Sequence, residues 1–180
     1  MRKLCAILCV LAISSAVLAA DATAPTANFQ SGDKEISGNI SIMKSSGGDF
    51  ETTLWMMLGS FGYFTSPNVQ LKGSCMIFGN KADDFTMIDG SLGFGADYLF
   101  EARMDLVPYA GGDILMSYSK IDVGGLGDET DTGIGWDIHA GIKQFIADST
   151  ALNYEIRYMS DSASHSKWLM FIIGFNVYLQ

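Results

Sequence analysis

From residue 34 onward, apolar and polar residues alternate along the chain with a period of two. Over residues 133–143 the even positions are apolar, beginning with Ile134 and Trp136, whereas the odd positions are small or charged, including Asp137 and His139. Such alternation is typical of β-strands that have two unlike faces. The pattern predicts eight strands, at residues 34–44, 50–64, 69–79, 86–100, 106–119, 133–146, 150–160 and 167–179. The second segment is apolar on both faces, so its phase is the least defined.

The connections between these segments alternate in length and composition. Polar stretches rich in Gly or Ser lie at 44–49, 79–84, 120–132 and 161–167, and compact turns lie at 65–68, 101–105 and 147–150. Long loops at one end and short turns at the other are produced when successive strands run antiparallel around a barrel. The sequence therefore predicts an all-β fold, an eight-stranded antiparallel up-and-down barrel.

Period two does not itself say which face points inward. A soluble barrel of the lipocalin type places its apolar face inside, whereas a membrane barrel turns that face to lipid. The strands are about eleven residues long, enough to cross a hydrocarbon layer of ~25 Å when tilted by ~45°. Aromatic residues near strand ends fit the headgroup level of a bilayer. We assign these to the outer face: Phe64, Tyr98, Phe100, Tyr118, Trp136, Tyr154, Tyr158 and Phe175. The sequence favours a transmembrane barrel.

The opposite face carries charges of both signs at mid-strand. An eight-stranded barrel encloses just enough room for side chains to fill, and an unpaired buried charge is costly. We therefore expect a network of paired charges in the lumen, narrowed further by Tyr109 and Tyr178. A narrow path for ions or protons and a catalytic set of carboxylates are the alternatives. The predicted lumen residues are Glu35, Lys72, Asp89, Asp97, Asp113, Asp137, His139, Lys143, Glu155 and Arg157.

The first twenty residues have the pattern of an export signal. Arg2 and Lys3 precede a run of about fifteen mostly apolar residues, which ends in small residues before Ala20. This run is short of the ~20 residues that a spanning helix needs, and a basic start with small residues at the end indicates a cleavable signal peptide. A lipoprotein acceptor at Cys9 is a weaker alternative. The expected organisation is a signal peptide at 1–20, a short flexible periplasmic segment at 21–33 and a barrel domain at 34–180.

Composition limits the function further. The chain has 11 Lys and Arg against 20 Asp and Glu, a formal charge of −9, and no basic stripe, so a nucleic-acid partner is not expected. After cleavage Cys75 is the one remaining cysteine, which rules out an intramolecular disulfide and a cysteine-based zinc site. The acidic stretch at 127–131 lacks the spacing of a calcium loop. We expect no metal and no cofactor.

An enzymatic role finds little support in the sequence. A lipid A hydrolase or acyltransferase would pair His139 with a serine two residues away on the same face, but position 141 is glycine. His165 and Ser166 are adjacent in a predicted loop without an orienting carboxylate nearby. We therefore expect that the protein is not an enzyme.

The last segment resembles the C-terminal assembly signal of bacterial outer-membrane proteins, with Gly174 followed by outward Phe175, Val177 and Leu179. The chain as a whole resembles the eight-stranded outer-membrane barrel family of Gram-negative bacteria, the OmpA/OmpX-like porin-family domain. The matching segments are 92–100, 106–119, 135–158 and 171–179.

This resemblance implies a multi-pass protein of the cell outer membrane. Its expected partners are outer-membrane lipid and lipopolysaccharide, the barrel-assembly machinery, and an extracellular ligand bound through the loops. The implied function is a structural or surface-contact role with at most weak conductance. A narrow porin or transport channel is the alternative, and an enzyme that modifies lipid A is the third reading.

Overall fold

The computed structural model describes residues 28–47, 50–82, 85–100, 106–123, 128–162 and 166–179. The predicted signal peptide and most of the segment at 21–33 lie outside these residues. Within the described part of the chain, no helix has the length and apolar character needed to cross a membrane.

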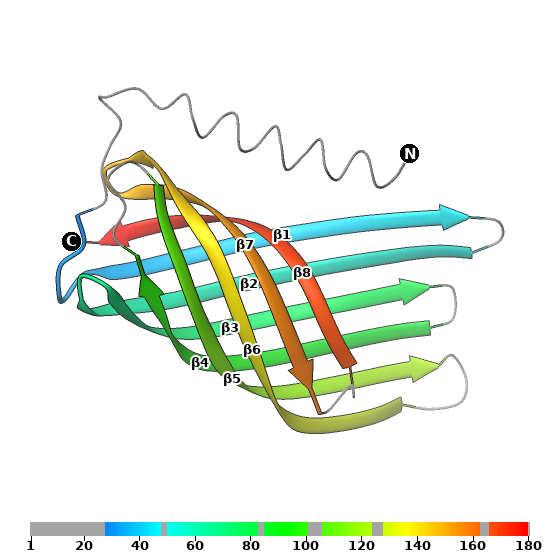
Figure 1. Cartoon of the computed structure of the whole chain (residues 1–180). Coiled ribbons are helices and arrows are strands. Elements are labelled where there is room, and N and C mark those ends of the chain that lie inside the picture. The colour runs from blue at the N-terminus through cyan, green and yellow to red at the C-terminus, as the bar shows by residue number, and fades with distance from the viewer. Residues whose placement is uncertain are drawn as a thin grey trace.

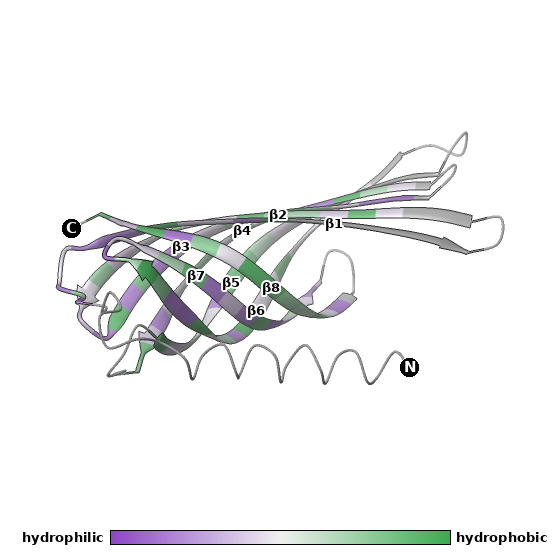
Figure 2. Ribbon diagram, turned by 90° about the horizontal axis from the view of Figure 1, so that it is seen from above, coloured by the Kyte–Doolittle hydropathy of each residue, from purple (hydrophilic) through white to green (hydrophobic). Residues whose placement is uncertain are grey.

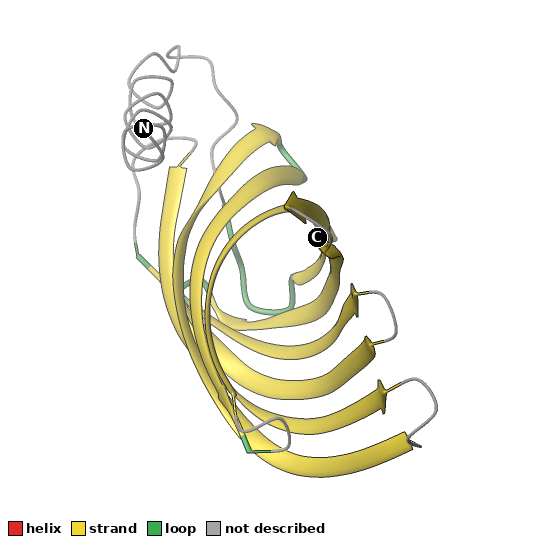
Figure 3. Ribbon diagram, turned by 90° about the vertical axis from the view of Figure 1, so that its right-hand side faces the viewer, coloured by secondary structure: helices red, strands yellow, loops and turns green. Residues whose placement is uncertain are grey.

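Eight strands form one closed antiparallel barrel in which each strand pairs with its neighbours in the chain and β8 returns to β1. Figures 1 and 3 show the strands curving around a common interior. The prediction of an eight-stranded antiparallel up-and-down barrel is confirmed. The strands are β1 Lys34–Gly47, β2 Phe50–Ser66, β3 Val69–Ala82, β4 Phe85–Leu99, β5 Leu106–Val123, β6 Asp128–Ala147, β7 Thr150–Asp161 and β8 Ser166–Leu179.

The strands are longer than predicted at the end with the long connections, called here the loop end; the other is the turn end. β5 runs to Val123 and β6 starts at Asp128, so most of the predicted loop at 120–132 is a paired hairpin. Backbone pairing does not require an apolar face. Residues 128–132 of β6 are polar on both sides and therefore give no hydrophobic period by which the sequence could reveal a strand, and the alternation at residues 120–123 of β5 covers only four positions.

The two faces of the sheet are inverted relative to a soluble barrel. Outward side chains are mainly apolar and exposed, such as Ile114, Ile134 and Leu169, whereas many inward side chains at mid-strand are charged and buried. The alternation of apolar and polar residues is visible along the ribbons in Figure 2. The charged side chains that could form a functional site therefore lie in the interior.

The closure between β1 and β8 is short. Among the described residues these strands pair over five positions, from Lys34 with Leu179 to Gly38 with Phe175. By contrast, β7 and β8 pair along the whole of both strands. Figures 1 and 2 show β1 and β8 diverging toward the loop end. Residues 39–47 of β1 and residues 166–174 of β8, for which the described structure shows no pairing of one strand with the other, are called the seam below.

Candidate functional site

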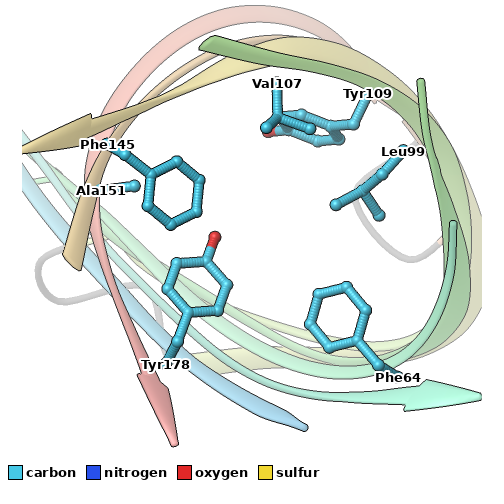
Figure 4. Close-up of a cluster of buried hydrophobic side chains, with 7 residues drawn as sticks. All are labelled: Phe64, Leu99, Val107, Tyr109, Phe145, Ala151 and Tyr178. Carbon is cyan, nitrogen blue, oxygen red and sulfur yellow. The ribbon is translucent and has the colours of Figure 1, made fainter. Parts of the chain in front are cut away.

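The turn end of the barrel is filled by a hydrophobic cluster (Figure 4). Its members are buried side chains from six strands, β2 and β4 to β8: Phe64, Leu99, Val107, Tyr109, Phe145, Ala151 and Tyr178. Phe29 packs against this cluster, stacked on Phe64 with ring centroids 4.6 Å apart and in contact with Phe145 and Tyr178. The prediction that Phe64 faces lipid is therefore wrong. Its ring is fully buried inside the barrel.

A tight turn brings Phe29 to this position. Gly32 has a φ of 105°, a left-handed conformation that glycine adopts without steric cost. The Gly32 amide donates to the Phe64 carbonyl at 2.9 Å, and the Phe64 amide donates to the Asp33 carbonyl at 2.9 Å. The segment that precedes β1 is thus hydrogen-bonded to the end of β2. We call Phe29 and the cluster beneath it the aromatic plug.

A first group of charges lies directly above the plug. The Lys143 ammonium donates to Glu35 at 2.5 Å, and the same carboxylate accepts from Gln70 at 3.1 Å and Asn176 at 3.0 Å. Lys143 also lies 5.0 Å from the ring centroid of Tyr109. These five side chains come from β1, β3, β5, β6 and β8, so the group joins strands that are not neighbours.

A second group is centred on His139. Its Nδ1 lies 2.7 Å from an Asp137 oxygen, and its Nε2 lies 2.8 Å from Asp97 and 2.9 Å from the Lys72 ammonium. Lys72 also donates to Asp97 at 3.0 Å. Both ring nitrogens are therefore held by carboxylates, which fixes the imidazole in place.

Arg157 connects the remaining acidic residues. Its Nε donates to Glu155 at 2.8 Å and its Nη1 donates to Asp137 at 3.1 Å, with Asp113 at 3.6 Å. Asp113 and Asp137 face each other across β5 and β6, a repulsive arrangement that Arg157 offsets. Glu155 also accepts from the Tyr109 hydroxyl at 2.6 Å.

The structure thus brings together nine of the ten predicted lumen residues. All nine are buried; the eight carboxylates and basic side chains each have a partner of opposite charge, and His139 lies between two carboxylates. Asp89 lies elsewhere: it is half-buried on the inner face of β4, near the loop end. The prediction omitted the uncharged partners Gln70, Asn153 and Asn176, although they lie on the inward phase of their strands.

Little space remains among these side chains. The void lined by Glu35, Lys72 and their neighbours has a volume of about 20 Å³. This is room for about one water molecule. Asp113, Asp137 and His139 offer ligand atoms within 4.8 Å of one another and could hold a metal ion. Arg157 and Lys72 contact the same groups, so side chains of the chain itself already neutralise them.

The inner face changes character toward the loop end. Above the charges lies a buried apolar layer of Leu58, Met76, Leu115, Met159 and Ile172. Beyond it is a cavity of about 420 Å³. Here the expectation of a polar lumen is wrong. The ambiguous segment at 50–64 contributes to this region, because Leu58 points inward while Met57 is exposed on the outer face.

The residues of the predicted assembly signal lie on β8 in the expected alternation. Phe175, Val177 and Leu179 are exposed on the outer face, and Gly174 is buried on the inner face. The side chains of Phe175, Val177 and Leu179 are part of the outer apolar surface next to the paired part of the β1–β8 closure.

Comparison with known proteins identifies relatives of this architecture. Residues 5–175 match the model of the family described as outer membrane protein beta-barrel domain. No curated protein sequence matches the chain.

Three solved structures are similar in fold. Neisserial surface protein A has a TM-score of 0.62 at 19% identity, covering 81% of this chain and 94% of that protein. The N-terminal barrel domain of OprF from Pseudomonas aeruginosa has a TM-score of 0.56 at 16% identity, and the match covers 83% of this chain and 98% of that domain. Ail of Yersinia pestis has a TM-score of 0.56 at 10% identity, and the match covers 83% of this chain and 100% of that protein.

Proposed function

Since the chain belongs to the family of outer membrane protein β-barrel domains, we propose that it is a closed barrel of the outer membrane with a structural or surface-contact role and at most weak conductance. The observation that carries this proposal is the filling of the interior. The aromatic plug occupies the turn end, and the paired charges above it leave a void of about 20 Å³. A hydrated ion would have to displace several of these contacts to pass.

The loop end is the end that faces outward in this proposal. Outer-membrane barrels have short periplasmic turns and longer extracellular loops, so the turn end, where the aromatic plug lies, is then periplasmic. Loops carried on a rigid scaffold are where binding usually occurs. The β5–β6 hairpin lies at the loop end, and its sequence carries three carboxylates within residues 128–131, so this hairpin suits a basic contact partner.

Ail, one of the proteins of similar fold, has been crystallised with a ligand. That protein was captured with sucrose octasulfate, a heparin analogue and a polyanion. The present chain has a formal charge of −9 and an acidic hairpin at its loop end. An extracellular ligand for this chain is therefore expected to be cationic or neutral.

A catalytic role is not part of the proposal. The His139 ring is held by Asp137 and Asp97, and position 141 carries no nucleophile. A Cβ at Gly141 would lie 2.8 Å from the Tyr109 ring, so a serine could not occupy this position without displacing that ring. The lumen charges are proposed to act as structural pairs, and the outward residues of β8 are proposed to be read by the barrel-assembly machinery.

Recording from the purified, refolded protein in planar lipid bilayers tests this proposal. We expect silence or small flickering currents under conditions where a trimeric porin, added as the positive control, gives stable steps. Stable openings of nanosiemens scale would contradict the proposal and establish the alternative, a transport channel. Insertion is verified in the same sample by the gel mobility of the folded barrel.

A further inference from the structure

The cavity at the loop end is lined mainly by large apolar side chains. They come from both sides of the barrel, where the rings of Phe78 and Trp168 lie 5.1 Å apart. The lining includes Met56, Met76, Met159 and Met170. Its volume of about 420 Å³ falls within the range of sites that hold small molecules, about 300–1,000 Å³. Flexible methionine side chains adapt to irregular apolar ligands.

The cavity reaches the outer face of the barrel at the seam. Leu169 and Phe171 point outward from β8 and are exposed, yet both contribute to the cavity lining. On the other side the lining includes residues 54–56 of β2, and β1 lies between β2 and β8 without pairing to β8 at this level. Because the outward side chains of β8 at this height, Leu169 and Phe171, are apolar, the opening lies at the depth of the hydrocarbon layer.

Two carboxylates lie at the mouth of the cavity. Asp89 and Asp161 line it on the side nearest the loop end, and Met159 lies deeper on β7. The Ser117 hydroxyl donates to Asp161 at 2.5 Å. An anionic head group would be repelled by these carboxylates, whereas a neutral or cationic head group would be accepted.

We propose that this cavity binds the alkyl chain of a single-chain amphiphile with a neutral or cationic head group, which enters from the outer membrane leaflet through the seam. Protein interiors are close-packed, and a void of this size forfeits dispersion contacts with its lining. Water compensates little for these contacts, because ordered water needs polar partners and the lining is apolar away from Asp89, Ser91 and Asp161. Alkyl chains are the apolar molecules that surround the seam in a membrane, so one of them fills the cavity.

The aromatic plug and the charged layer close the other end of the interior. The bound chain therefore has no path toward the periplasm through the barrel, and the site acts as a receptacle. This property is independent of conductance: a silent barrel can bind the amphiphile, and a failure to bind does not imply an open pore.

Fluorescence quenching by a brominated ligand tests the proposal. The chain has 3 tryptophans, of which Trp168 lies in the cavity and Trp136 is exposed on the outer face. Trp55→Phe with Trp136→Phe leaves Trp168, and Trp55→Phe with Trp168→Phe leaves Trp136 as the matched control. Both variants are refolded in phosphatidylcholine vesicles and titrated with ω-bromolauryl alcohol.

We expect quenching of Trp168 to saturate and to be reversed by unbrominated lauryl alcohol, whereas quenching of Trp136 rises linearly with the ligand fraction in the membrane. Ser91→Phe, which fills part of the cavity from β4, should raise the half-saturating ligand fraction about tenfold. Leu92→Phe, one residue away on the outer face, should leave it unchanged. ω-Bromolauric acid should bind more weakly than the alcohol.

Linear quenching of both tryptophans overturns the proposal, as does an equal response of Ser91→Phe and Leu92→Phe. If Ser91→Phe fails to fold, judged by gel mobility, the competition experiment on the Trp168 variant decides. Failure of lauryl alcohol to restore its fluorescence then refutes the site. Tighter binding of the acid than of the alcohol refutes the assigned head-group preference.

Discussion

Replacing Lys143 with methionine tests whether the buried charges stabilise the barrel as pairs. Lys143 supplies the one ammonium that contacts Glu35 in the described structure, and the remaining partners of this carboxylate are the amides of Gln70 and Asn176. Removing one member of a buried pair costs about 3–5 kcal/mol, because the other charge is left without compensation. We therefore expect Lys143→Met to lower the free energy of unfolding by about this amount.

The double variant separates pairing from packing. Glu35→Gln with Lys143→Met removes both charges at nearly constant volume, and its cost should fall to about 1 kcal/mol, since a buried pair contributes little relative to uncharged replacements. Lys34→Met, next to Glu35 but exposed, is the control and should change stability by less than about 0.5 kcal/mol. Urea titrations of folding and unfolding in lipid vesicles provide the free energies. A loss below about 1 kcal/mol for Lys143→Met, or equal losses for the single and double variants, would refute this reasoning.

Three further predictions address the outer face, the plug and the seam. Ile138→Arg should lower the free energy of unfolding by about 2–4 kcal/mol, whereas Thr132→Arg, on the same face of β6 near the loop end, should lower it by about 0–1 kcal/mol. Refolding titrations in lipid vesicles measure both, and equal losses would contradict the assigned lipid face. Phe29→Ala should cost about 2 kcal/mol through lost ring contacts with the plug, whereas Gln30→Ala, with an exposed side chain, should cost little in the same assay. Hydrogen exchange should be fast for about half of the amides of residues 166–173, those directed toward the seam, and slow throughout the paired part of β8; uniform protection would show that the seam is closed.

The sequence allowed the strands and their faces to be predicted because the membrane imposes a simple rule on both. Each strand presents apolar residues to lipid at every second position, so the phase of Ile134, Trp136 and Ile138 also placed Asp137 and His139 inside. Alternation carries no information on which inward residues meet. Lys143 and Glu35 are 108 residues apart and lie on β6 and β1, which are not neighbours. Their contact depends on the tilt and register of all the strands between them.

The predictions failed where both faces of a strand are apolar. Phe64 and Tyr63 are adjacent at the end of β2, and either ring could have been the one at the membrane interface. The structure turns Tyr63 outward and Phe64 inward, because Phe29 supplies a stacking partner inside the barrel. That partner lies outside the strands, in a segment whose sequence has no periodic signal. The apolar layer around Leu58 was hidden for the same reason: its inward residues resemble those of the lipid face.

The interior is therefore asymmetric along the barrel axis, and this asymmetry bears on function. At the turn end, a molecule would have to separate the rings around Phe29 and then break charge pairs such as Lys143 with Glu35, each at a cost of several kcal/mol. At the loop end, β1 and β8 do not pair beyond Gly38 within the described residues, so entry between them breaks no backbone hydrogen bonds. We therefore expect a molecule that reaches the interior to enter from the outer leaflet side and to leave by the same route. This favours binding at the cell surface over passage across the membrane.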